Sequence, residues 1–373
     1  MTGSHTSGTF KKGCSRQNGT FIRTFLPAAS AVTAALLLAL SGNVFAAAAL
    51  QANAAEEKTS STGFFLDTVV TITLYGDTDS AAMDGCFELL EQYEQMLSRT
   101  IEGSDVWNIN HSAGEATTVN EETAALIETA LEYSQLTDGA FDITITPLVE
   151  LWDIDGKSEL LAGVTDDSSE ESIADSLIPS EEEIASALSH VDDSVVSVDE
   201  NIVTLSDPEA EIDLGGIAKG YIADCLKEYL LSQGIEHALI NLGGNVLTVG
   251  TKSDGSAWKI GIQEPFGESS DIIAVVECTD ESVVTSGTYE RYFEVDGTIY
   301  HHILDPSTGY PVDNGLTSVT ILSDSSTTCD ALSTACFVLG LEDGMELIES
   351  LENIEALFIT EDETLYRTSG FPE

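Results

Sequence analysis

Residues 211–221 read EIDLGGIAKGY, in which we expect an apolar-flanked strand to end in Gly-Gly and run into a helix. They combine features suited to binding an anionic group. Paired glycines let a backbone approach a ligand closely, and the free amides at a helix start suit a phosphate. Lys219 falls in the first turn of the helix expected here, where a lone cation is unfavourable unless an anion lies near. The order matches neither a Walker A loop nor GxGxxG. An ordinary strand–turn–helix with an extended lysine explains the same residues, so both interpretations stay open.

Residues 330–340, DALSTACFVLG, place a carboxylate and a hydroxyl four residues apart. On a helix, Asp330 and Thr334 share one face. Both are hard oxygen ligands, which suit Mg²⁺ or Ca²⁺ and not zinc. Two ligands do not complete a cage, so backbone oxygens, waters or substrate phosphates must supply the others. A solvated helix face with Asp330 near its start is the alternative.

Residues 300–311, YHHILDPSTGYP, carry two histidines on a strand that leads into a Pro/Gly turn. Neighbouring residues of a strand point to opposite faces, so His301 and His302 face different surroundings. A histidine beside a turn can act as a general base or a ligand. Two histidines on an exposed strand can also have no role.

The charge of the chain shows why such a site needs its own cation. Four of the 13 Lys and Arg residues precede residue 56, which leaves nine against 65 Asp and Glu, a formal charge of −56. Such a surface repels nucleic acid and anionic lipid, so neither is expected as a partner. An anionic ligand requires a local cationic device.

The N-terminus follows the plan of a secretory signal. Residues 1–55 contain no Asp or Glu, and basic residues precede an apolar run and the small residues around Ala46. We expect a signal peptide over 1–46, a flexible tether over 47–62 and an exported protein. An uncleaved N-terminal anchor is the alternative. A lipid anchor is not expected, because Asn43 stands where a lipoprotein has Cys.

No cysteine pair has CxxC spacing, so zinc is not expected.

The elements that would position these residues are predicted from periodicity and turn signals. The first half has a strand at 67–76, helices at 79–97 and 120–137 with a polar loop between them, and a hairpin at 195–205. An acidic, Ser-rich surface excursion covers 153–183. A helix is expected to start after Ser180, with Ser180 as its N-cap residue and Glu183 three residues further on.

The second half is mainly strand. Helices are expected at 217–232, 328–339 and 342–351, and strands at these segments: 237–241, 246–249, 258–263, 272–277, 283–286, 290–295, 299–304, 316–322 and 355–360. Strands and helices come in runs without βαβ alternation, which indicates an α+β fold.

Six segments within residues 64–367 read, in order, TDGAFDIT…PLVxLW, DLGGIAKGY, NLGGN, TSGTYERYF, HILDPSTGYPV and DALSTA. In this order they resemble the ApbE family of flavin transferases. The resemblance implies one large mixed domain over 63–373, with a mostly antiparallel sheet and flanking helices. It also implies Mg²⁺-dependent transfer of FMN from FAD to a Thr or Ser of an acceptor protein, with release of AMP.

The resemblance also assigns residues by position. The metal would be held by Asp330, Thr334 and the Gly216 carbonyl, with Ser333 assisting. His302 would activate the incoming hydroxyl, whereas His301 stands where many members have Ser. The FAD contacts would come from these residues: Leu66, Thr100, Ala140, Phe141, Asp142, Asp213, Lys219 and the backbone near Leu304.

Three positions depart from the family pattern. Leu66 replaces a frequent Met at the flavin edge, Thr100 replaces a frequent aromatic, and residues 153–156 replace Gly-aromatic-Gly. Thr100 carries no ring, so ring stacking with the flavin is not expected at this position. Two other functions remain open: hydrolysis of FAD to FMN and AMP, and non-catalytic flavin binding at the cell surface.

Overall fold

The computed structural model describes residues 58–76, 80–163, 176–268 and 270–372. The predicted signal peptide at 1–46 and residues 47–57 of the predicted tether lie outside these ranges. Among the residues that are described, no helix is both long enough and apolar enough to cross a membrane.

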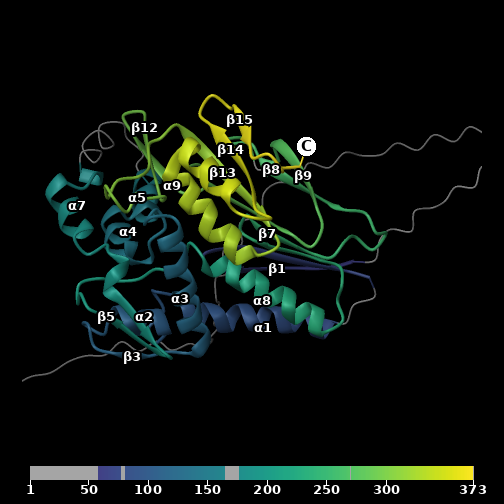
Figure 1. The fold of residues 1–373 in the computed structure, drawn as a ribbon, viewed down its shortest axis with the longest axis horizontal. Helices are drawn as coiled ribbons and strands as arrows, with labels where there is room; N and C mark the ends of the chain where they lie inside the picture. The colour runs from purple at the N-terminus through teal and green to yellow at the C-terminus, as the bar shows by residue number, and fades with distance from the viewer. Residues whose placement is uncertain (1–57, 77–79, 164–175, 269, 373) are drawn as a thin grey trace, which may run out of the picture. The chain divides into compact units, whose positions relative to one another are not determined.

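An eight-stranded sheet organises the described domain (Figure 1). Every neighbouring pair in it is antiparallel. The strands, in spatial order, are β1 (Lys58–Phe65), β2 (Thr68–Tyr75), β6 (Ala238–Leu242), β7 (Asn245–Val249), β10 (Ser282–Gly287), β13 (Leu316–Ser323), β14 (Glu355–Thr360) and β15 (Leu365–Arg367). The predicted α+β class with a mostly antiparallel sheet is confirmed.

Strand β13, the sixth of the eight, is buried along its whole length because both faces of the sheet are covered there. Val319 and Ile321 pack with the long helix α9 (Ser326–Ser350) on one side. Leu322 packs on the other side with the hairpin of β8 (Trp258–Gln263) and β9 (Ile272–Cys278). Alternate side chains of a strand point to opposite faces, and half of the residues of β13 are nevertheless Ser or Thr. Two of them bond neighbouring strands: Thr320 bonds Thr285 of β10, and Thr317 donates to the Ile359 carbonyl of β14.

Two smaller sheets and several helices complete the described part. The small sheets are β11 (Tyr292–Val295) with β12 (Thr298–His301), and β3 (Thr117–Thr118) with β5 (Ile202–Leu205) and β4 (Val196–Asp199). The helices besides α9 are α1 (Ser80–Leu97), α2 (Asp105–Asn110), α3 (Glu121–Leu136), α4 (Thr146–Trp152), α5 (Ile154–Ala162), α7 (Glu181–Leu188) and α8 (Ala218–Ser232), with 3₁₀ turns at Ile143–Ile145 and Asp193–Val195.

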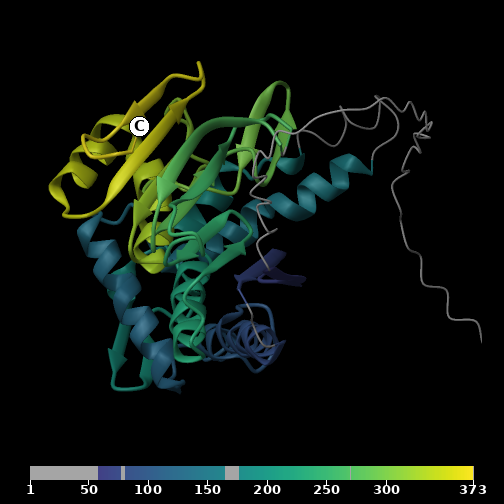
Figure 2. The same ribbon diagram turned by 90° about the vertical axis from the view of Figure 1, so that its right-hand side faces the viewer.

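Helices α1, α8 and α9 form one packed group beside the sheet (Figures 1 and 2). Figure 2 looks nearly along α1, which lies against α8, and α8 lies in turn against α9. The two helices predicted at 328–339 and 342–351 are joined into α9, whose only interruption is Gly340 at φ 82°. This conformation is open to glycine but disfavoured for other residues, so the direction of α9 changes there.

Several local predictions differ from the structure. Residues 58–62 belong to β1 and not to a tether, because their backbone pairs with β2. The polar loop between α1 and α3 contains α2, which Ser104 caps by accepting a hydrogen bond from Trp107. Strands β3 and β15 were not predicted, since two or three residues carry little periodicity.

The acidic stretch 153–183 is partly helical. It contains α5 and the start of α7, and residues 164–175 lie outside the described part. The predicted capping box of α7 is confirmed: the Glu183 amide donates to the Ser180 hydroxyl, and Glu183 accepts from the Ser180 amide.

Candidate active site

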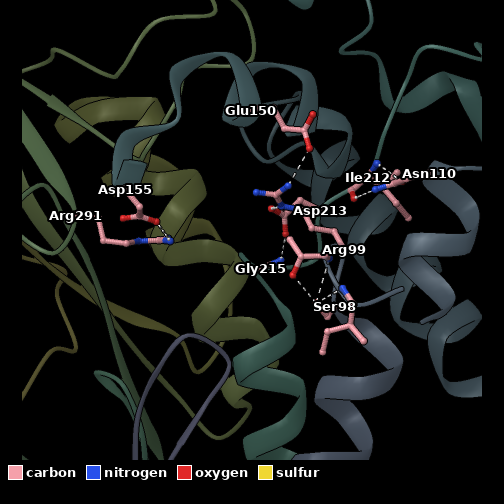
Figure 3. Close-up of polar contacts among 11 residues, drawn as sticks. Ser98, Arg99, Asn110, Glu150, Asp155, Ile212, Asp213, Gly215 and Arg291 are labelled. Carbon is pink, nitrogen blue, oxygen red and sulfur yellow. Dashed lines mark hydrogen bonds and ion pairs between the residues drawn. The ribbon is translucent and has the colours of Figure 1, made fainter. Parts of the chain in front are cut away.

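The segment before α8 is a tightly held loop, not the end of a strand as the sequence predicted. The side chain of Asn110 donates to the carbonyl of Ile212 at 2.9 Å and accepts from its amide at 2.8 Å. The Asp213 carboxylate accepts from the Gly215 amide at 2.7 Å and from Arg99 Nε at 3.0 Å (Figure 3). The Asp213 amide also donates to the Ile143 carbonyl at 2.8 Å, so one backbone group and several side chains satisfy the loop in place of a neighbouring strand.

The contact between α8 and α9 brings the segments of Lys219 and Asp330 together. Gly220 is needed there, because a Cβ would clash with the Ser326 carbonyl and lie 2.8 Å from Asp330 Cβ. The Gly220 amide donates to Asp330 Oδ2 at 2.8 Å, while Lys219 Nζ lies 3.9 Å from Oδ1. Asp330 is only 5% exposed. The hydrogen bond from the Gly220 amide and the nearby Lys219 ammonium group fix the orientation of its carboxylate.

Hydroxyl groups and a glycine complete the surroundings of Asp330. A Cβ on Gly216 would lie 3.9 Å from Thr334 Oγ1 and 3.0 Å from the ring of Phe141. Ser286 on β10 lies 2.8 Å from Ser333 Oγ and 3.4 Å from Thr334 Oγ1. The structure thus brings together four motifs that are far apart in the sequence: DLGGIAKGY, TDGAFDIT, TSGTYERYF and DALSTA.

Ala140, Phe141 and Asp142 lie in the turn that leads from α3 to the 3₁₀ turn at Ile143–Ile145. Phe141 is buried with its ring against Gly216. Asp142 accepts from the amide and the hydroxyl of Thr144, each at 2.7 Å. Burial raises the pKa of Asp142 above its ordinary value, and the bonds from Thr144 oppose that rise.

Leu66 forms the tip of the β1–β2 hairpin. Leu66 and Asp67 both have positive φ, 53° and 56°, which is uncommon for a residue with a branched side chain. The Leu66 amide donates to Glu94 of α1 at 2.8 Å, and this bond holds the turn. Thr68 packs so closely against Gly243 that a Cβ there would clash with it. The hairpin tip is thereby fixed beside the NLGGN turn.

Thr100 and Leu304 lie in different surroundings. Thr100 is exposed, and its amide donates to the Ser98 hydroxyl at 3.2 Å. Leu304 is buried in a cluster with Trp152, and its backbone forms a bridge with Pro311. The Thr100 amide and hydroxyl both contact the neighbouring Ser98, so the role of Thr100 toward FAD stays a prediction.

The two histidines have different roles in the structure. His301 is buried: its Nε2 donates to the Val312 carbonyl at 2.8 Å, and its Nδ1 accepts from the Ile303 amide. His302 keeps some solvent access and places Nδ1 3.3 Å from the Arg291 carbonyl. A carbonyl only accepts, so Nδ1 carries the hydrogen and Nε2 keeps a lone pair.

The protonation of His302 suits a base. Desolvation, followed by the nearby charge of Arg291, lowers the pKa of His302 well below its ordinary value. A lowered histidine pKa means that the neutral ring persists into mildly acidic solution. The imidazole is therefore unprotonated at neutral pH.

Four further residues near the site received no role from the sequence: Arg99, Gly220, Ser286 and Glu290. Glu290 keeps solvent access, but the surrounding protein raises its pKa to about 7, against the opposing charges of Lys219 and Arg291. Ser286 and Glu290 lie in TSGTYERYF and Gly220 in DLGGIAKGY, so the motifs contained the signal. For Arg99, the only signal was a cation in a very acidic chain.

The oxygen atoms around Asp330 fit a hard cation. Within the described ranges, no three His, Cys, Asp or Glu side chains gather into a metal-binding cluster. Instead, Asp330 Oδ2 accepts from the Gly220 amide while Oδ1 faces Lys219, and the Thr334 hydroxyl, one turn further along α9, lies beside the loop of Gly216. One carboxylate with hydroxyl and carbonyl oxygens suits Mg²⁺, which keeps waters and shares substrate phosphates.

Comparison with known proteins identifies the family of this chain. A model described as the ApbE family matches residues 66–358. The FAD:protein FMN transferase of Klebsiella pneumoniae is 40% identical over 294 residues, covering 78% of this chain and 86% of that protein. The enzyme of the same name from Treponema pallidum is 34% identical over 306 residues, covering 78% and 80%.

Solved structures show the same fold. The ApbE protein of Thermotoga maritima superposes with a TM-score of 0.74 at 36% identity, over 84% of this chain and 97% of that one. The flavin transferase ApbE of Vibrio cholerae gives 0.72 at 29% identity, over 85% and 98%. This chain belongs to the ApbE family.

Proposed function

We propose that this chain transfers FMN from FAD to a Thr or Ser side chain of an acceptor protein and releases AMP, with Mg²⁺ as cofactor. The observation that carries the proposal is the meeting of Asp330, Thr334, Lys219 and the Gly216 loop at the α8–α9 contact. The names of the relatives, FAD:protein FMN transferase, support the same reaction.

Recognition of the FAD diphosphate falls to Lys219 and to the positive end of the α8 dipole. A helix start carries a partial positive charge. Several amides there are already bonded, since those of Ile217 and Ala218 donate to the Leu214 carbonyl and that of Gly220 to Asp330. Lys219 adds a full charge and lies between the Gly215 carbonyl at 3.1 Å and Asp330. In a chain of net charge −56 after residue 55, this local device offsets the repulsion of an anionic substrate.

Asp330, Thr334 and the Gly216 carbonyl would hold the Mg²⁺, with Ser333 behind them. When bound, the ion neutralises charge on the phosphates, the main requirement of phosphoryl transfer. Ser333 is fully buried and donates to the Asp330 carbonyl at 2.9 Å, so it also supports the turn that carries Asp330.

The isoalloxazine and adenine parts of FAD would lie along Leu66, Thr100, Ala140, Phe141, Asp142 and Leu304. Ala140 and Asp142 are half-buried on either side of the buried Phe141, whose ring packs against Gly216 and so joins this turn to the phosphate loop, which supports the assignment.

The transfer step forms one bond and breaks one. The acceptor hydroxyl oxygen attacks the FMN phosphorus, the P–O bond of the diphosphate breaks, and AMP leaves with the electron pair. The proton of the hydroxyl passes to His302 Nε2, whose lone pair the Arg291 carbonyl leaves free. The lowered pKa of His302 keeps that nitrogen unprotonated at neutral pH.

Incubation of the protein with FAD, Mg²⁺ and a peptide carrying an Asp/Ser-Thr target motif tests the proposal. We expect a covalent FMN mass shift on the peptide that disappears with chelator and with a Thr→Ala peptide. Free FMN without peptide modification would indicate a hydrolase instead. Unchanged FAD would indicate a flavin carrier.

Export is part of the proposal. The basic start, apolar run and small residues of 1–46 support it. N-terminal sequencing of the protein from the producing cells tests it: a mature chain that begins after Ala46 agrees, whereas an intact Met1 contradicts cleavage.

A further inference from the structure

The Arg99 side chain joins three elements around the phosphate loop. It follows α1, and its guanidinium bonds to Asp213 in the loop before α8 and to Glu150 of α4, at 3.0 and 3.2 Å (Figure 3). Arg99 and Asp213 have side chains only 25% and 24% exposed, so this pair is better shielded than a surface ion pair. The guanidinium is planar and can bond two carboxylates at once.

Carboxylates gather at this point. Besides Asp213 and Glu150, Glu211 lies near: burial raises its pKa, Glu150 raises it further, and His111 and Arg99 lower it. Three negative charges would thus stand beside the loop that precedes Lys219. An anionic diphosphate approaching this loop would meet them unless a cation offset them.

The same contacts set the geometry of the loop. Asp213 uses one carboxylate oxygen for the Gly215 amide and the other for Arg99. Gly216 follows directly, so a change at Arg99 is transmitted to the backbone that faces Thr334.

We propose that Arg99 is a positioning residue of the diphosphate-binding site, which orients Asp213 and offsets the charges of Asp213, Glu150 and Glu211 so that an anionic dinucleotide can bind. The inference rests on the proposed function only for the identity of that dinucleotide. Loss of a purely structural ion pair would weaken the binding of all ligands alike. Loss of Arg99 in the proposed role weakens binding according to the charge of the ligand.

Binding measurements without an acceptor test this directly. The variants are Arg99→Gln, Arg99→Lys, Glu150→Gln and the double variant Arg99→Gln/Glu150→Gln, and Lys259→Gln is the control. Lys259 pairs with Glu277 on the exposed β8–β9 hairpin, so its loss changes the net charge equally without touching the site. The ligands are FAD, ADP and uncharged riboflavin, measured by calorimetry at low and high salt.

We expect Arg99→Gln to weaken FAD and ADP binding about tenfold or more at low salt, with a smaller loss at high salt and little change for riboflavin. Glu150→Gln should recover part of the loss in the double variant, because it removes one unpaired carboxylate. Arg99→Lys should lie between, since it keeps the charge but not the two-carboxylate bridge.

Equal weakening for riboflavin and ADP, or no recovery by Glu150→Gln, would overturn the proposal and leave Arg99 a structural residue. Wild-type affinity in Arg99→Gln would overturn it as well. The outcome is separable from the proposed function: a wild-type protein that shows these binding differences but modifies no peptide contradicts FMN transfer alone.

Discussion

Two ionic contacts near the site differ in how they are held. In the Lys219–Asp330 contact, the carboxylate is buried and also accepts a hydrogen bond from the Gly220 amide. The Arg291–Asp155 pair, by contrast, joins side chains that are 53% and 64% exposed, at 3.3 Å (Figure 3). The first contact depends on the packing of α8 against α9. The second joins two side chains that are largely exposed to water.

The difference indicates which part of the site tolerates change. A buried carboxylate fixed by a backbone amide cannot be moved without moving α8 or α9. An exposed ion pair contributes little to stability, because water screens it and both side chains lose freedom. We call the exposed pair of Asp155 and Arg291 the outer rim of the site. Asp155 lies in residues 153–156, where this chain departs from the family pattern, which agrees with an outer rim whose residues can be replaced.

The largest effect is expected for Asp330→Asn. The amide keeps the shape but removes the charge that a hard cation requires, so the transfer rate should fall by about 10³-fold. Initial rates at saturating Mg²⁺ measure this. Asp343→Asn, an exposed position on the same helix, is the matched control. A wild-type rate for Asp330→Asn would refute the metal assignment.

A smaller loss, about 10²-fold, is expected for His302→Asn, since a general base contributes at least that much. The pH profile sharpens the test. Catalysis requires the unprotonated ring, and the pKa of His302 lies well below its ordinary value, so the wild-type rate should decline only at a pH below the usual histidine range. That acidic decline should disappear in the variant.

His301→Ala is the comparison for His302. The variant should keep a near-normal transfer rate per folded molecule. Its free energy of unfolding should fall by about 1–3 kcal/mol, because the substitution leaves buried backbone groups unpaired. If His301→Ala lost the acidic decline and His302→Asn kept it, the roles would be reversed.

Gly220→Ala tests the packing of the buried contact. The added methyl would meet the Ser326 carbonyl and Asp330 Cβ, so overpacking should lower stability by about 1–3 kcal/mol. Thermal unfolding measures it. Gly163→Ala is the control, since a Cβ there meets its nearest neighbour at an ordinary 3.4 Å. Equal melting temperatures for the two variants would show that α8 can move away from α9.

The smallest effect is expected for Asp155→Asn. Loss of the exposed pair with Arg291 should change the free energy of unfolding by less than about 1 kcal/mol. Denaturant titration checks this. A loss as large as that of Gly220→Ala would mean that the outer rim is as rigid as the α8–α9 contact.

Much of the fold could be predicted from the sequence because periodicity is local. The alternation at 67–76 predicted β2, and the Ser180/Glu183 spacing predicted the start of α7. The segment before α8 was predicted to be a strand, but its partner is the side chain of Asn110, about a hundred residues earlier in the chain. No local pattern reports such a partner.

The sequence by itself determined that Asp330 and Thr334 share a helix face, because residues four apart on a helix always do. It also determined the acidity that makes every cation near the site significant. Only the tertiary structure decided that Gly220 donates to Asp330, 110 residues away, and that Arg99 holds Asp213 across 114 residues. Those contacts depend on how α1, α8 and α9 pack, and packing between distant elements leaves no regular spacing in the chain.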